Sequence, residues 1–146
     1  MITIIQRVSQ AKVTVDGTDI GVIGHGIMAL VAVEKTDGKP QADRLLERIL
    51  NYRIFADADD KMNLSLRDIE GGLLIVPQFT LAADTQKGNR PSFTSAAPPE
   101  MGRELFGYFR QQAGAIYPNC QFGQFGADMK VALINDGPVT FTLRCV

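Results

Sequence analysis

The sequence has no tryptophan, a single histidine and only two cysteines. His25 stands between Gly24 and Gly26, a pattern that favours a solvent-facing turn over a catalytic base and argues against a catalytic triad or a histidine metal cluster. Cys120 and Cys145 match no zinc spacing, so we expect reduced thiols, no metal and no cofactor. An enzyme of this composition must work with backbone groups, hydroxyls, carboxylates or its own substrate.

Long apolar runs and an excess of either charge are also missing. No run approaches the ~18 residues of a membrane span, and the first residues read as a strand rather than a leader peptide, so we expect a cytoplasmic protein without membrane contact. The formal net charge of −1 excludes a generally basic nucleic-acid-binding protein but leaves room for a local basic patch. The length fits one domain over residues 1–146, which needs no disulfide or metal to fold.

Strand-like apolar patterns are present through most of the chain. The first third combines alternation with Asp16-Gly17, a strong hairpin signal, and predicts an antiparallel meander. The segment 139–146 alternates poorly, which places it at a sheet edge or a subunit contact. The expected strands are 1–8, with Val13 and Val15 continuing its alternation, then 20–23, 27–33, 53–56, 73–76, 129–134 and 139–146.

Two segments show helical spacing instead. Apolar residues recur at helical intervals after Pro40, which stands where proline is favoured, and again over 100–113. The connection over 82–99 is long for a compact domain, and such loops are usually functional. We therefore expect an α+β fold, with a curved, barrel-like, mostly antiparallel sheet and two packed helices in a single domain.

Four stretches of the chain resemble the D-aminoacyl-tRNA deacylase (D-tyrosyl-tRNA deacylase) family from the first residue to the last. They are Arg7-Val8-Ser9-Gln10-Ala11-Lys12-Val13, Pro77-Gln78-Phe79-Thr80-Leu81, Lys87-Gly88-Asn89-Arg90-Pro91-Ser92-Phe93, and Phe125 to Met129 continuing to Asn135-Asp136-Gly137-Pro138-Val139-Thr140. The resemblance implies a homodimeric hydrolase that releases D-amino acids from the 3′ acceptor end of tRNA. In one departure, Pro77 replaces the family's usual serine and supplies neither a hydroxyl nor a backbone N–H.

The resemblance assigns catalysis to Gln78, Phe79 and Thr80. Backbone N–H groups of this segment can stabilise an oxyanion, and the ribose 2′-hydroxyl of the terminal adenosine is implied to assist, so no protein base is required. Thr80 is either a nucleophile, which needs an adjacent base that the local sequence does not show, or a positioning group. Phe125 and Met129 are either core residues or a surface on which the terminal adenine stacks.

The resemblance also implies that Gly137-Pro138 is a cis pair whose carbonyls enter the active site of the partner subunit. There they would hold the substrate's α-amino group and exclude an L side chain, although a Gly-Pro pair taken alone is usually trans. Glycine escapes such a filter, so glycyl-tRNA, including glycine mischarged on tRNA-Ala, is an expected second substrate. Arg7 either braces this turn or is a surface charge. Lys87 and Arg90 are candidate phosphate contacts, with Lys130 as a third.

Two other interpretations fit the same sequence. One is a non-catalytic module that binds a small molecule or RNA on this fold, and the other is an editing domain for a different mischarged tRNA. A change at Gly137 or Pro138 separates them, because only a deacylase with a chirality filter would lose its selectivity.

Overall fold

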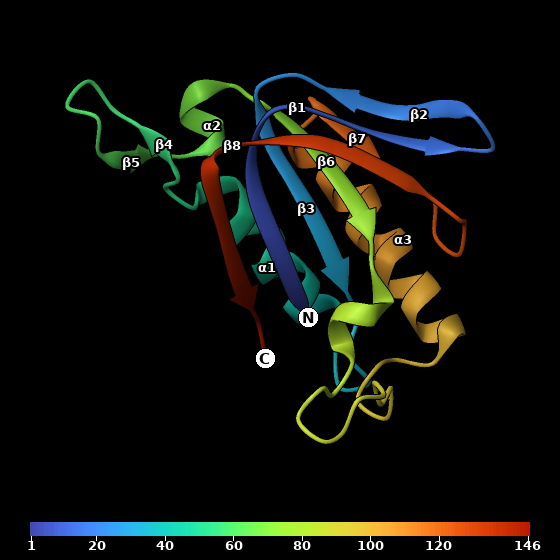
Figure 1. The fold of residues 1–146 in the computed structure, drawn as a ribbon. Coiled ribbons are helices and arrows are strands. Elements are labelled where there is room, and N and C mark those ends of the chain that lie inside the picture. The colour runs from blue at the N-terminus through green and yellow to red at the C-terminus, as the bar shows by residue number, and fades with distance from the viewer.

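The computed structural model describes all residues, 1–146. Its sheet is built on a long hairpin whose first arm is strand β1 (Ile2–Val15) and whose second arm consists of β2 (Thr18–Ile23) and β3 (Gly26–Ala32) (Figure 1). Strand β1 turns at Asp16 and Gly17, which have φ of 49° and 78°, into β2. Strand β3 continues along the same side of β1, because Ala11 pairs with Ile23 and Val8 pairs with Gly26 in one unbroken register. The predicted meander is therefore wrong: β2 and β3 do not pair with each other, and Gly24-His25 bends a single arm.

The remaining strands make the sheet mixed. Strand β6 (Gly72–Pro77) runs parallel to β3, and β7 (Cys120–Phe122) runs parallel to β6. Strand β8 (Lys130–Arg144) is antiparallel to β1 on its other side, and this is its only pairing. A Cβ at Gly21 of β2 would contact both β6 and β7, so the sheet curls into a nearly closed barrel, as predicted. Strands β4 (Phe55–Ala56) and β5 (Met62–Leu64) form a separate small hairpin.

Two helices cover the sheet, as the spacing predicts. Helix α1 (Lys39–Asn51) buries every apolar residue of its predicted face, and α3 (Pro99–Ile116) buries Leu105 and Phe109. A one-turn helix, α2 (Leu66–Ile69), and a 3₁₀ turn, η1 (Phe79–Ala82), complete the fold. No helix combines the length and the apolar character that a bilayer crossing requires.

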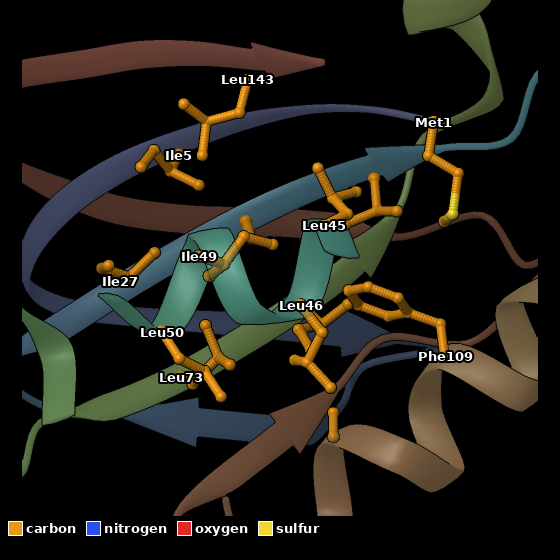
Figure 2. Close-up of a cluster of buried hydrophobic side chains, with 14 of the residues drawn as sticks. Met1, Ile5, Ile27, Leu45, Leu46, Ile49, Leu50, Leu73, Phe109 and Leu143 are labelled. Atoms are coloured by element: carbon orange, nitrogen blue, oxygen red, sulfur yellow. The ribbon is translucent and has the colours of Figure 1, made fainter. Parts of the chain in front are cut away.

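The main core lies between α1, α3 and the strands. In Figure 2 the side chains of α1 point towards Ile5 of β1, Ile27 of β3, Leu73 of β6 and Phe109 of α3. Each of these side chains is fully buried, and such burial contributes about 1.5–3 kcal/mol per side chain. The core therefore anchors the first part of β6, and the candidate site begins where this strand ends.

Candidate active site

A cavity of about 490 Å³ opens where strands β3 and β6 end. Its walls come from the ends of these two strands, the start of η1, the first turn of α3 and the loop that leads into β8. The walls are mostly apolar, and the volume lies within the range of small-molecule sites. The lining includes Val31, Val76, Gln78, Phe79, Phe125 and Met129.

The cavity brings together four residues that the sequence singles out. Gln78 and Phe79 contribute one wall, and Phe125 and Met129 contribute another. Phe79 is 62% exposed and rests against Phe93 with ring centroids 5.3 Å apart, so it is not a core aromatic. Phe125 and Met129 are half-buried, which means that they pack on the core and also face the cavity.

Thr80 lies beside this cavity in η1 and is exposed. The backbone N–H of Gln78 donates to the carbonyl of Val31 at 2.8 Å, and this bond directs the chain out of β6 into the turn. The hydrogen-bond partner of the Thr80 hydroxyl is the side-chain amide of Gln78, which cannot accept a proton as a base does. The N–H groups of Phe79 and Thr80 begin a helical turn, where backbone donors lack intrahelical partners.

Lys87 and Arg90 lie outside the cavity on the loop between η1 and α3. Both are exposed and neither forms an ion pair, while paired backbone hydrogen bonds between Asp84 and Ser92 close their loop. Lys130 is also exposed, and its ammonium lies 3.2 Å from a carboxylate oxygen of Asp128. The structure does not bring these cations together with the segment from Gln78 to Thr80.

Sequence reasoning missed Arg103, which lines the cavity. Its guanidinium lies over the Phe125 ring, 5.0 Å from the centroid. The neighbouring Gly102 permits this arrangement, because a Cβ there would lie 3.3 Å from Cζ of Phe125. A glycine inside an otherwise amphipathic helix was the one signal of this close approach.

Gly137 and Pro138 form an exposed turn within β8, and the peptide bond between them is cis. Arg7 contacts this turn, because its Nε donates to the carbonyl oxygen of Asp136 at 2.9 Å. Its Nη1 donates to the carbonyl oxygen of Ile54, just before β4, also at 2.9 Å. Arg7 is therefore a bracing contact in this structure rather than a free surface charge.

The turn and the cavity lie at opposite ends of β3. Val8 pairs with both Gly26 and Asn135, which puts the turn at the start of β3. Val31, five residues further along β3, pairs with Pro77 beside the cavity. Five strand residues span ~17 Å, so a protomer does not bring its own turn to its own cavity.

Neither cysteines nor metal ligands contribute to the site. Burial raises the pKa of the Cys120 thiol to about 12, which keeps it protonated and unreactive near neutral pH. No three His, Cys, Asp or Glu side chains lie close enough together to hold a metal ion.

Comparisons with known proteins identify the family to which the chain belongs. The sequence profile of the D-Tyr-tRNA(Tyr) deacylase family matches residues 4–144. A D-aminoacyl-tRNA deacylase of Nitrosococcus oceani is 61% identical over 99% of this chain and 93% of its own length. One of Pseudomonas putida strain KT2440 is 58% identical over 97% of each chain.

Two solved structures share the whole fold. The c-Myc DNA Unwinding Element Binding Protein superposes with a TM-score of 0.95 at 37% identity, over 100% of this chain and 99% of that one. A probable eukaryotic D-amino acid tRNA deacylase superposes with a TM-score of 0.84 at 15% identity, over 99% and 98%, and supports the fold alone. By profile and by identity along its length, the chain belongs to the D-Tyr-tRNA(Tyr) deacylase family of enzymes.

Proposed function

We propose that this protein hydrolyses the ester that joins a D-amino acid to the terminal adenosine of tRNA, and so proofreads aminoacyl-tRNA in the cytoplasm. The observation that carries the proposal is the cavity, which joins Gln78 and Phe79 to Phe125 and Met129. Relatives about 60% identical along the chain are named for this activity.

The apolar part of the cavity fits the terminal adenine. Phe125 presents a flat aromatic face and Met129 a polarisable thioether, and stacking on an aromatic ring contributes ~1–3 kcal/mol per base. An adenine held here leaves the ribose and the ester near the mouth formed by Phe79. The reacting carbonyl is then next to the backbone of η1.

Hydrolysis needs an activated water and support for a negatively charged oxygen. Water attacks the ester carbonyl, the bond to the ribose oxygen breaks, and that oxygen leaves with a proton. The N–H groups of Phe79 and Thr80 are suitable donors for the oxyanion, each worth ~3–4 kcal/mol. The ribose 2′-hydroxyl assists the water, and the Thr80 hydroxyl, bonded to an amide, has a positioning role.

The chirality filter requires a second copy of the chain. The Gly137–Pro138 turn is remote from the cavity of its own protomer, whereas a two-fold axis beside the first half of β8, between the cavity and the turn, would place the turn of each copy at the cavity of the other. Strand β8 pairs only with β1, so its outer edge is free, and Ile134 beside it is 53% exposed. A long free edge is normally covered, and a homodimer with shared active sites covers it.

In the shared site, the Gly137 and Pro138 carbonyls of one copy hold the α-amino group in the cavity of the other. The same backbone leaves no space for an L side chain, and rejection by ~10³ corresponds to about 4 kcal/mol. Glycine has no side chain to clash, so glycyl-tRNA, including glycine on tRNA-Ala, is a second substrate. Lys87 and Arg90 are exposed and unpaired, which suits weak, salt-sensitive phosphate contacts with the acceptor arm.

The test is to incubate the purified protein with D-tyrosyl-tRNA and L-tyrosyl-tRNA, with and without a chelator, and to follow the released tyrosine. The proposal expects rapid loss of the D ester alone, unchanged by the chelator. Equal loss of both esters would refute the filter. Retention of tRNA without any hydrolysis would instead favour a non-catalytic RNA-binding module.

A further inference from the structure

The Gly137–Pro138 turn is an excursion from the middle of strand β8. Val8 pairs with Asn135 and Gln6 pairs with Thr140. Two steps along β1 therefore correspond to five steps along β8, and the extra residues of β8 form the turn. The regular ladder of backbone hydrogen bonds is interrupted over this stretch. Other contacts must therefore fix the shape of the turn.

Asn135 supplies such a contact through both ends of its side-chain amide. Its Oδ1 accepts a hydrogen bond from the backbone N–H of Val139 at 2.9 Å, and its Nδ2 donates to Oγ1 of Thr140 at 2.8 Å. One side chain where the turn begins is thus joined to two groups where it ends. Arg7 holds the remaining side through the carbonyl of Asp136.

The two turn residues are not held by burial. Gly137 and Pro138 are both exposed. Gly137 has a φ of +137°, and a Cβ there would lie 2.7 Å from Cγ2 of Val139 and 3.1 Å from Nη2 of Arg7. The turn is therefore closely packed against its own supports, and its position depends on them.

We propose that Asn135 is a positioning residue for chirality, whose amide holds Gly137–Pro138 in the shape that excludes an L side chain. The inference rests on the proposed function, in which this turn enters the partner's cavity and selects by steric clash. A steric clash rejects the L side chain only if the backbone of the turn is held rigidly and cannot move away from it. Loosening the turn therefore lowers selectivity before it lowers hydrolysis of the D ester.

Three substitutions separate the two hydrogen bonds. Asn135→Ala removes both, and Thr140→Val removes only the one to the hydroxyl. Asn135→Asp keeps an acceptor for the Val139 N–H and offers a second oxygen to the Thr140 hydroxyl, which can donate. We expect the ratio of D to L kcat/KM to fall about tenfold in Asn135→Ala, about 1.4 kcal/mol of discrimination, and about threefold in Thr140→Val. We expect Asn135→Asp to retain most of the wild-type ratio of D to L kcat/KM.

The experiment measures kcat/KM for D-tyrosyl-tRNA and L-tyrosyl-tRNA with the full-length protein and each variant. Matched controls are Asn119→Ala and Thr142→Val, because both side chains are exposed and neither makes a hydrogen bond. Hydrogen exchange at the Val139 amide reports the turn itself and is expected to accelerate in Asn135→Ala. A purely structural role would lower both rates together and leave the ratio unchanged.

A lower ratio in Asn135→Ala and Thr140→Val, with recovery in Asn135→Asp and no change in the controls, supports the proposal. Faster exchange at Val139 with an unchanged ratio overturns it and leaves the deacylase function standing. If Asn135→Ala does not fold, an unchanged ratio in Thr140→Val overturns it equally. A wild-type protein that hydrolyses neither ester, or both equally, refutes the proposed function and this inference with it.

Discussion

The wall of the cavity depends on a contact between two side chains, Arg103 and Phe125. The guanidinium lies 5.0 Å from the ring centroid and is exposed on its other side. A cation–π contact at an exposed site is worth about 0.5–1 kcal/mol. We expect Arg103→Gln to raise KM for aminoacyl-tRNA about two- to fivefold with little change in kcat, because the ring that receives the adenine is held less firmly.

Steady-state kinetics with D-tyrosyl-tRNA measures this effect. Arg110→Gln is the matched control. Arg110 is on α3 like Arg103, and its guanidinium lies 4.8 Å from the ring centroid of Phe122, but it does not line the cavity. A fall in kcat at constant KM would contradict a role in binding and place Arg103 in the chemical step.

The residues of the site differ in how far the sequence predicts them. Gln78, Phe79, Phe125 and Met129 belong to motifs that resemble a family, and the structure places them around one cavity. Arg103 belongs to no motif, and on an amphipathic helix it reads as a surface charge. Only the packing of the loop before β8 against α3 makes it part of the wall, and such long-range packing leaves no local pattern.

At the scale of elements, periodicity predicts the helices better than the sheet. Helix α1 buries all of its predicted apolar face because that pattern and its packing are both local. The pairing of strands is not local, so β2 and β3 read as two strands of a meander although they form one bent arm. Strand β7 has only three residues, too few for alternation to be recognised.

Strands β3 and β6 start at a point of close backbone approach, which makes a sharp prediction. A Cβ on Gly26 would lie 1.9 Å from the carbonyl oxygen of Gly72. Overpacking typically costs 1–3 kcal/mol, and this clash is with rigid backbone, so we expect Gly26→Ala to lower the free energy of unfolding by about 3 kcal/mol or more. Urea unfolding followed by circular dichroism measures it.

Gly24→Ala provides the control two residues away, because nothing lies within 4 Å of a Cβ there. Its unfolding midpoint should stay close to that of the wild type. A Gly26→Ala protein of wild-type stability would show that the two strands separate readily at this end.

At the scale of the whole molecule, the separation of turn and cavity is the reason that the proposed function requires a second copy of the chain. One protomer carries the cavity and the turn at opposite ends of β3, and the first half of β8 runs between them. Under the proposed function, a monomer has a cavity but no filter beside it. We expect the dimer to be the selective form, and any variant that separates the subunits to lose discrimination between the D and L esters.

Mixed dimers test that arrangement directly. Gly137→Ala damages the turn, since the added Cβ would lie 2.7 Å from Val139 at a φ of +137°, and Met129→Trp fills the cavity. Under the proposed arrangement, the open cavity of the Gly137→Ala copy in a mixed dimer would receive the intact turn of the other copy. Adding excess Met129→Trp protein, after subunit exchange, should therefore suppress hydrolysis of L-tyrosyl-tRNA by Gly137→Ala while hydrolysis of the D ester continues. If each turn served its own cavity, the added protein would leave the L rate unchanged.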